Sequence, residues 1–206
     1  RDVLAAITDA PLGNADFPYM SARTIDAGCA PVLALRVSYV GELGYELHVP
    51  TEYALYLYDA LWRAGEPFGI ANVGYRAVNS LRLEKQYLVW GSDITPDYNP
   101  YEAGLGFCVA SNKGEFGARA ALAEVKAAGP RQKLTWFNAP GDVNMWGGEI
   151  VLVGDRVIGR VTSAGYGYTV GRNILCAYVA ASEPVDESYS VEVMGTRHPI
   201  ERHVRP

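Results

Sequence analysis

The chain has 206 residues, of which 49% are hydrophobic, 20% charged and 11% aromatic. This composition is too apolar for a disordered protein, and three cysteines are too few for a disulfide scaffold. The formal net charge of −5 argues against nucleic acid as a partner, because phosphate binding needs a basic face. No stretch reaches the roughly 18 uninterrupted apolar residues of a membrane-spanning helix, so we expect no membrane partner.

The cysteines and histidines indicate structural rather than metal-binding roles. Cys29, Cys108 and Cys176 are far apart, and each lies among apolar neighbours. This setting predicts buried free thiols in a reducing compartment, which we expect to be the cytoplasm, or the mitochondrial matrix in a eukaryote. The three histidines and three cysteines show no CxxC or HxxxH spacing. We therefore expect no metal site.

The first half of the chain begins with a predicted short helix, which is followed by a loop rich in Pro, Gly and Asn. Two runs of β-forming residues, 31–40 and 45–49, flank the loop Gly41–Gly44 and predict a hairpin. In the second strand, the alternation of side chains places Glu46 and His48 on one face.

Helices are predicted for residues 51–65, 74–86 and 117–128, and a strand is predicted for 105–110. Thr51 is expected to cap the first of these helices, and Gly65 to end it. The expected inward-facing residues of the first two helices are Ala54, Leu57, Tyr58 and Leu61, and Ala77, Val78 and Leu81.

After residue 130 the chain shows no convincing helical stripe, and short β-rich runs are separated by glycines. Turn signals occur at Gly154-Asp155 and, more weakly, at Gly195-Thr196. Several short strands at this spacing predict a small all-β barrel or sandwich. The predicted strands are 133–137, 150–153, 157–163, 174–180, 189–194 and 198–204. We therefore expect one domain over residues 1–129 and a second over 130–206.

The segment from Tyr39 to Glu46 is the most informative local feature. A carboxylate such as that of Glu46 can accept two parallel N–H bonds, as from the 2-amino-pyrimidinone edge of a pterin. Tyr39 could stack on such a ring. The alternative is that Glu46 is a solvent-facing strand residue paired with a basic side chain, and spacing alone favours this alternative.

Arg76 is a second candidate, because it lies at the start of a predicted helix, where the helix dipole disfavours a cation. Its partner could be an acidic neighbour or an anionic ligand, and the sequence favours neither. Arg82 and Glu84, on the same helix, do not face each other and are interpreted as architectural. The stretch 165–168 is predicted to be a strand-connecting loop in which Tyr166 could line a groove.

Five ordered motifs carry a family resemblance: RVSYVGELGYELHVP (36–50), SLRLEKQYLVWGSDI (80–94), NPYEAGLGF (99–107), KGEFGARAAL (113–122) and GRVTSAGYGYTVGRNILCAYV (159–179). In this order they resemble the tetrahydrofolate-binding aminomethyltransferase family, whose founding member is the T-protein of the glycine cleavage system. The match covers most of the chain. The resemblance implies an α+β fold, with a ferredoxin-like α/β lobe followed by a small C-terminal antiparallel β-barrel.

The phrases SYVGELGYELHVP and LEKQYLVWGSDI are more similar to the C-terminal half of dimethylglycine and sarcosine dehydrogenases than to the T-protein itself. In those enzymes, an N-terminal flavin domain oxidises an N-methyl group, and the C-terminal module passes the carbon to tetrahydrofolate. The resemblance implies tetrahydrofolate as the cofactor of this chain. FAD is expected only in a flavin domain preceding it, because the chain has no GxGxxG motif.

By resemblance, Glu46 matches the carboxylate that holds the amino edge of the pterin, Arg76 matches an arginine that helps to hold folate, and Tyr39 matches a tyrosine lining the pterin site. The family's key aspartate belongs to a first lobe, which would precede Arg1. We therefore expect no catalytic residue in this chain, and no activity from it alone. The expected partners are a folate, the missing first lobe and a flavin domain.

Two other functions stay open. The chain could be a folate-binding module without catalysis or with a regulatory role, as in the iron–sulfur repair branch of the family. That branch carries a KGC motif, whereas this chain has Lys113-Gly114-Glu115. The chain could also be a structural remnant that binds nothing by itself.

Overall fold

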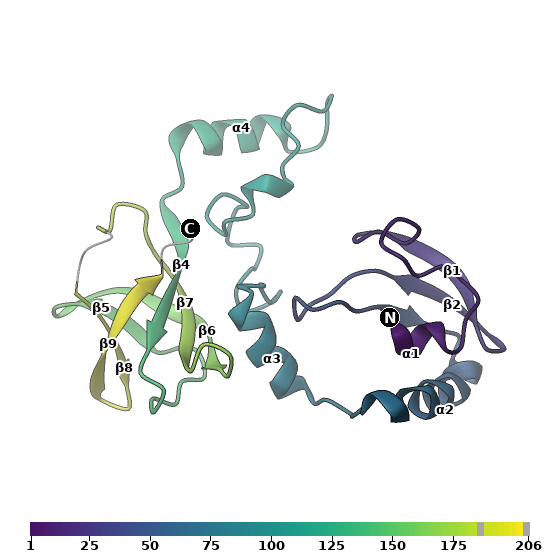
Figure 1. The fold of residues 1–206 in the computed structure, drawn as a ribbon. Helices are drawn as coiled ribbons and strands as arrows, with labels where there is room; N and C mark the ends of the chain where they lie inside the picture. The colour runs from purple at the N-terminus through teal and green to yellow at the C-terminus, as the bar shows by residue number, and fades with distance from the viewer. Residues whose placement is uncertain (185–187, 204–206) are drawn as a thin grey trace. The chain divides into compact units, whose positions relative to one another are not determined.

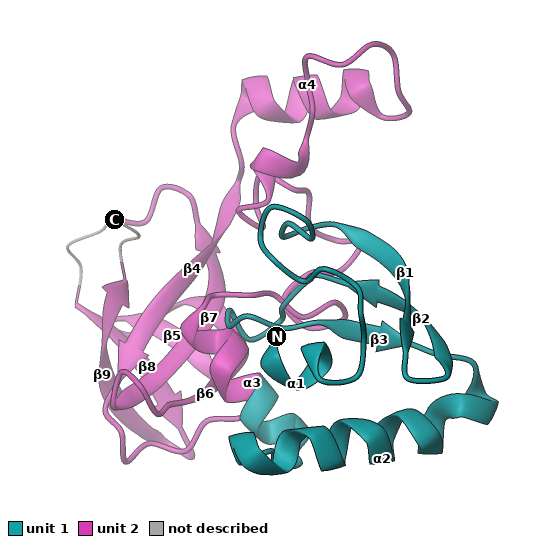
Figure 2. Ribbon diagram, turned by 45° about the vertical axis from the view of Figure 1, so that its right-hand side comes forward, with its two compact units in different colours: residues 1–78 teal, residues 79–206 magenta. Residues whose placement is uncertain are grey.

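The structure, a computed structural model, describes residues 1–184 and 188–203. These residues divide into two compact units, residues 1–78 (unit 1) and residues 79–206 (unit 2), as Figure 2 shows by colour. Each unit combines helices with its own β-sheet, so the expected mixture of helix and sheet is confirmed.

Unit 1 is built on a three-stranded antiparallel sheet in the order β1-β2-β3. Figure 1 labels β1 and β2, and Figure 2 labels all three strands. Its core lies between the sheet and the helices, and its largest fully buried side chain is Phe17. The elements are α1 (Asp2–Ala5), β1 (Ala22–Ala27), β2 (Ala30–Leu35), β3 (Glu46–His48), η1 (Thr51–Tyr53), α2 (Ala54–Gly65) and η2 (Glu66–Phe68).

The predicted hairpin exists, but its strands are shorter and its loop longer than expected. β2 ends at Leu35 and β3 starts at Glu46, so the connection has the ten residues 36–45 instead of four. The pairing of β2 with β3 stops at Leu35 and Glu46, whereas on the other side of β2 the N–H of Arg36 still donates to the carbonyl of Ser21. Strand β1 itself was not predicted, because only Ile25 and Ala27 of its six residues are buried and no alternating pattern marks it.

Helix α2 contacts α1 and contributes Leu57 to the core of unit 1. Its inward face differs from the expected stripe. Ala60 is buried, whereas Ala54 is exposed and Tyr58 is 47% exposed. The reason is that Tyr58 turns outward, where it stacks on Trp62. Thr51 also makes no capping hydrogen bond, because a short 3₁₀ turn precedes the helix.

Helix α3 (Tyr75–Glu84) includes the boundary between the units, and unit 2 continues with η3 (Gly106–Cys108) and α4 (Arg119–Ala128). The strand predicted at 105–110 is wrong: this segment forms the 3₁₀ turn η3, in which the N–H of Cys108 donates to Leu105. Two glycines in the GLGF sequence make the segment a poor strand. In α3, the buried residues are Ser80, Arg82 and Leu83, not the three expected.

The C-terminal half forms a closed antiparallel barrel in the strand order β4-β7-β6-β5-β8-β9. Each of the six predicted runs contributes one strand, so the predicted barrel is confirmed. Val204, the last residue of the sixth predicted run, lies outside the described residues. The strands are β4 (Gln132–Ala139), β5 (Ile150–Val153), β6 (Arg156–Gly167), β7 (Arg172–Ala180), β8 (Tyr189–Val193) and β9 (Thr196–His203).

The barrel interior is filled by apolar side chains from all six strands, with Phe137, Val151 and Leu175 fully buried. Gly154 turns the chain between β5 and β6 with a positive φ of 57°, as its turn signal predicts. The loop predicted at 165–168 starts later than expected. β6 runs through Gly167, because residues 165–167 still pair with β7, and the turn follows it.

The cysteine prediction is correct in part. All three thiols are free, but only Cys176 is buried, whereas Cys29 and Cys108 are exposed. Cys29 sits in the tight turn between β1 and β2, and Cys108 in η3, where apolar neighbours in sequence do not imply burial. Among the described residues, no helix is both long and apolar enough to cross a membrane.

Candidate functional site

Glu46 lies on the exposed face of the sheet in unit 1. The register of β2 and β3 sets Glu46 opposite Leu35 and His48 opposite Leu33. Nε2 of His48 lies 3.6 Å from Oε2 of Glu46, and both side chains are more than half exposed. The carboxylate is therefore accessible and retains acceptor sites for donors from a ligand.

Tyr39 belongs to the loop of residues 36–45, which leads into Glu46. The start of this loop is anchored by Arg36, which is buried and donates a hydrogen bond to the carbonyl of Phe17 at 3.3 Å. Its end is anchored by Tyr45, whose ring centroid lies 5.2 Å from the guanidinium carbon of Arg36. Tyr39 lies between these anchors, with 37% of its surface exposed. An exposed ring held in this way offers a surface for stacking.

Arg76 is the second residue of α3 and is exposed. The first turn of this helix contains no acidic residue that would balance its positive end. A cation at this end is disfavoured by the helix dipole, so an anionic group nearby is stabilising. Arg76, Tyr39 and Glu46 all belong to unit 1.

Tyr166, the fourth predicted residue, belongs to unit 2 and lies in β6. Its ring packs edge-on against Tyr168, with 5.0 Å between the centroids. Its carbonyl accepts a hydrogen bond from Oγ of Ser80 at 2.5 Å. The side chain is partly exposed, and a Cβ on Gly141 would lie 3.1 Å from the ring. Tyr166 is therefore packed against its own unit on two sides.

Unit 2 contains a buried ion pair. Nη1 of Arg82 lies 2.9 Å from Oδ2 of Asp93, and the two side chains are 3% and 0% exposed. The other guanidinium donors reach Oγ of Ser163 at 2.8 Å and Oδ1 of Asn79 at 2.9 Å. Nη1 also donates to the carbonyl of Tyr87. The pair thereby joins α3 to β6, which is an architectural role for Arg82.

The carboxylate of Asp93 accepts further hydrogen bonds. Oγ1 of Thr162 donates to Oδ1 at 2.7 Å, and the N–H of Val89 donates to Oδ2 at 2.9 Å. The thiol of Cys176 also contacts Oδ1 of Asp93, at 3.4 Å. The hydroxyl of Tyr178 donates to the backbone carbonyl of Asp93 at 2.8 Å. Burial raises the pKa of Cys176, and the nearby carboxylate raises it further. The thiol therefore stays protonated and structural.

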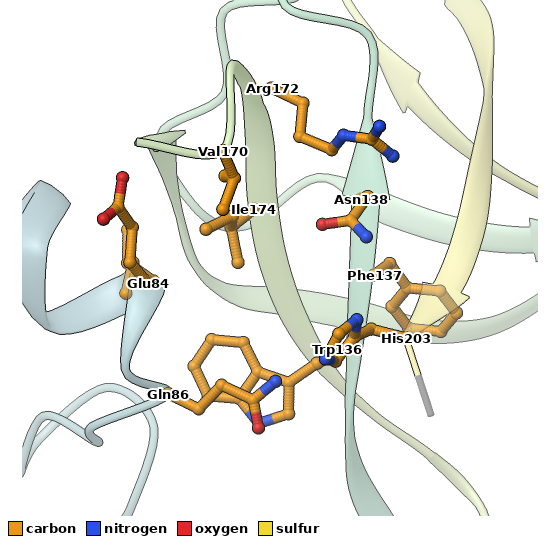
Figure 3. A pocket seen from close by; sticks show the side chains of 10 residues that line it. Glu84, Gln86, Trp136, Phe137, Asn138, Val170, Arg172, Ile174 and His203 are labelled. Atoms are coloured by element: carbon orange, nitrogen blue, oxygen red, sulfur yellow. The ribbon is translucent and has the colours of Figure 1, made fainter. Parts of the chain in front are cut away.

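A cavity of about 370 Å³ lies in unit 2, between the last turn of α3 and the outer side of the barrel. Figure 3 shows that charged and apolar side chains share its walls. The polar residues that line it are Glu84, Gln86, Asn138, Arg172 and His203, and the aromatic ones are Trp136 and Phe137. Among the described residues, no cluster of His, Cys, Asp and Glu could hold a metal ion.

Comparison with protein families decides where the chain belongs. Residues 1–113 match the family model described as the GCVT N-terminal domain, and residues 132–206 match the glycine cleavage T-protein C-terminal barrel domain. The chain belongs to the glycine cleavage T-protein family. The predicted resemblance is thus confirmed, and the closed barrel of β4–β9 is the barrel domain of this family.

Among relatives of this T-protein-family chain, the mitochondrial sarcosine dehydrogenase of Mus musculus is 37% identical over 214 residues, covering 100% of the chain and 23% of the relative. The mitochondrial dimethylglycine dehydrogenase of Homo sapiens is 37% identical over 202 residues, covering 97% of the chain and 23% of the relative. An aminomethyltransferase of Streptomyces coelicolor is 38% identical over 205 residues, covering 97% of the chain and 55% of the relative. The chain thus spans about a quarter of the dehydrogenases that it matches.

A solved structure agrees with these family matches. The glycine cleavage system aminomethyltransferase T from Bartonella henselae superimposes with a TM-score of 0.84 and 26% identity, covering 98% of this chain and 55% of that one. The chain is therefore an aminomethyltransferase-like module related to sarcosine and dimethylglycine dehydrogenases.

Two features of this T-protein-family chain were missed by sequence reasoning. The partner of Arg82 could have been found, because Asp93 lies in the same motif, 80–94, and carries the opposite charge. The cavity gives no such signal. Its lining comes from segments near residues 84, 137, 172 and 203. The strand register brings the last three together, and helix α3 adds the first.

Proposed function

We propose that this chain is the tetrahydrofolate-binding part of an aminomethyltransferase-like module that accepts a one-carbon unit from an N-methylated amine. The observation that carries the proposal is the accessible carboxylate of Glu46, which lies beside His48 on the exposed sheet face. In a family that includes aminomethyltransferases, a carboxylate in this position is suited to the paired N–H donors of a pterin edge.

The residues present fit a folate. Glu46 would accept the amino edge of the pterin, Tyr39 would stack on the ring, and the cation of Arg76 would attract the negative charge of the molecule. Tyr166 belongs to unit 2, and its part in lining a groove stays a prediction. Tetrahydrofolate would supply the nitrogens that take up the carbon unit. The protein's own contribution would be to orient the reactants and exclude water, without a covalent enzyme intermediate.

The remaining steps are proposed for the longer protein. Because the chain spans 23% of the dehydrogenases, flavin-dependent oxidation of the amine would take place elsewhere in such a protein. We propose that the 206 residues alone bind folate but do not catalyse transfer. We place the division between the modules at residues 129 and 130, and this is supported by the barrel family match, which begins at residue 132. The names of the mammalian relatives support a mitochondrial compartment if the source is a eukaryote.

A second candidate is a folate-binding module with a regulatory role. A relative named the pyruvate dehydrogenase phosphatase regulatory subunit, mitochondrial, of Mus musculus is 33% identical over 185 residues, covering 86% of the chain and 21% of that protein. Its name places a regulatory protein among the relatives of this chain. Folate binding without any transfer in the longer protein would favour this candidate.

The test of the proposal is calorimetric titration of 5-formyltetrahydrofolate into the chain. Glu46→Gln keeps the size of the side chain but replaces one acceptor by a donor, which opposes the paired donors of the pterin. We expect this variant to lose affinity by about 10- to 100-fold, the equivalent of one or two charge-assisted hydrogen bonds. Arg76→Ala should also weaken binding.

The matched controls are Glu52→Gln and Arg63→Ala, which change exposed charges of the same unit on and before α2. These controls should bind like the unchanged chain. Binding that survives Glu46→Gln would overturn the residue assignment. A folded chain that binds no folate would overturn the proposed function.

A further inference from the structure

The cavity of unit 2 lies outside the barrel, and the strand register explains its composition. Trp136 and Asn138 alternate with the inward-facing Phe137 on β4, so both point to the outer side. The register sets Asn138 opposite Ile174 of β7, and Trp136 opposite His203 of β9. The outer side of these three strands therefore forms one wall of the cavity.

The side chains that form the apolar wall of the cavity are well packed. Trp136 is 7% exposed, Ile174 is 8% exposed and Leu83 of α3 is fully buried, and together these side chains form one cluster. A Cβ on Gly165 would lie 2.8 Å from Cδ1 of Leu83, so the absence of a side chain there lets α3 approach β6 closely. The indole and its neighbours give the cavity a firm apolar surface, suited to a ring or a branched aliphatic chain.

Two residues of opposite charge line the cavity from different elements. Glu84 comes from the last turn of α3, and Arg172 from the start of β7 (Figure 3). The N–H of Thr169 donates to Oε1 of Glu84 at 2.7 Å, and this hydrogen bond holds the carboxylate in place. The carboxylate of Glu84 can still accept hydrogen bonds from other donors. Oε2 of Glu201 lies 3.6 Å from Nη1 of Arg172, and the two side chains are 83% and 50% exposed. This single contact leaves most of the five guanidinium donors for a ligand.

We propose that this cavity binds an amino acid in its zwitterionic form, with the ammonium group toward Glu84, the carboxylate toward Arg172 and an apolar side chain against Trp136. A simple anion would meet the carboxylate of Glu84 without compensation, and a simple cation would meet Arg172. A zwitterion satisfies both, and the amide of Asn138 can donate to its carboxylate.

The size of the cavity agrees with this ligand class. A volume of about 370 Å³ lies at the lower end of the range of roughly 300–1,000 Å³ that is typical of small-molecule sites. Such a volume admits an amino acid with a large side chain. This site uses none of the residues of the proposed folate site, so either can be correct without the other.

The test uses three probes with the same ring: L-phenylalanine carries both charges, 3-phenylpropionate lacks the ammonium group, and 2-phenylethylamine lacks the carboxylate. Binding is followed by the indole N–H signal of Trp136 in a ¹H–¹⁵N NMR spectrum of the chain, and the signal is identified from its loss in Trp136→Phe. We expect L-phenylalanine to shift this signal with saturation, and each single-charge probe to bind at least tenfold more weakly.

Two charge variants separate the ends of the ligand. Glu84→Gln keeps an acceptor for Thr169 but should weaken L-phenylalanine and 2-phenylethylamine, with no loss for 3-phenylpropionate. Arg172→Gln should weaken L-phenylalanine and 3-phenylpropionate only. The controls Glu124→Gln and Arg160→Gln change exposed charges of the same unit that do not line the cavity, and they should bind like the unchanged chain.

Three outcomes would overturn the proposal. The first is that L-phenylalanine leaves the Trp136 signal in place at millimolar concentration. The second is that 3-phenylpropionate binds as tightly as L-phenylalanine, which would make the cavity an anion site. The third is that both charge variants, folded by circular dichroism, bind L-phenylalanine as the unchanged chain does.

Discussion

Arg82 and Asp93 form an ion pair inside unit 2, with 2.9 Å between Nη1 and Oδ2 and almost no exposed surface on either side chain. The pair joins Arg82 of α3 to Asp93, eleven residues later in the chain, and through Ser163 and Thr162 it is linked to β6. Burying two charges is costly, and the cost is offset here because each charge also has neutral hydrogen-bond partners. The attachment of α3 to the barrel therefore depends on both residues together.

Asp93→Asn should destabilise the chain strongly, because it leaves the buried guanidinium of Arg82 without its counter-charge. We expect the free energy of unfolding of unit 2 to fall by about 3–5 kcal/mol. Urea denaturation followed by fluorescence measures this change. The control is Glu115→Gln, which breaks an exposed i,i+4 pair with Arg119 and should cost less than about 1 kcal/mol. Equal losses for the two variants would contradict the structural role of the buried pair.

Alkaline pH should destabilise the fold through Cys176. Burial first and the carboxylate of Asp93 second raise the pKa of this thiol above its ordinary value of 9.0. Above pH 9 the unfolded chain loses the thiol proton while the folded chain keeps it. Because the unfolded state then binds fewer protons, the free energy of unfolding falls as the pH rises. One such group contributes a slope of at most about 1.4 kcal/mol per pH unit.

The measurement is the free energy of unfolding from pH 8 to 10.5 for the unchanged chain and for Cys176→Ala. The variant should be less stable at pH 8 but should lose less stability with rising pH. Tyr178 leaves a smaller slope in the variant, because burial raises its pKa as well. Cys108→Ala, which removes an exposed thiol, should keep the original slope. If all three proteins lose the same amount of stability per pH unit, the idea that the Cys176 thiol loses its proton only in the unfolded chain is wrong.

The three thiols should differ in their reaction with a thiol reagent. Cys29 and Cys108 are exposed, whereas Cys176 is fully buried against Thr162. At pH 8 we expect rapid modification of two thiols, and modification of the third only when the chain is unfolded in urea. Mass spectrometry after digestion identifies the modified residues. Rapid modification of Cys176 in the folded chain would contradict its burial.

Gly159→Ala should disrupt the pairing of β6 with β7. A Cβ at this position would lie 2.3 Å from the carbonyl oxygen of Tyr178, and the backbone there cannot move without breaking the sheet. We expect a loss of about 2–3 kcal/mol in the free energy of unfolding. Gly74→Ala is the matched control, because its Cβ would meet open space. Thermal unfolding of both variants by circular dichroism distinguishes a steric clash from a general effect of losing glycine.

The barrel strands could be predicted from the sequence because their signals are local. β-branched and aromatic runs, divided by glycine turns such as Gly154, mark each strand without reference to distant residues. Strand β1 and the turn η3 lack such a signal. β1 buries only two of its six side chains, and η3 forms where an apolar segment is interrupted by Gly104 and Gly106.

In the candidate site, too, local relationships could be predicted from the sequence and long-range contacts could not. Glu46 and His48 were placed on one face by the two-residue period of a strand, and the structure brings them to 3.6 Å. The contacts of Asp93 with Thr162 and Cys176 span 69 and 83 residues along the chain. No local pattern encodes contacts of that length, because they arise from the order in which the barrel strands pair.

Closure of the barrel also affects how the chain can associate with itself. A closed sheet has no outer strand, so β4–β9 offer no backbone edge to which another chain could add a strand. The sheet of unit 1 is open, with β1 and β3 as its outer strands. β3 is only three residues long and two of its side chains are polar, which makes it a poor template for another strand. Aggregation through strand addition would therefore start at β1, at residues 22–27.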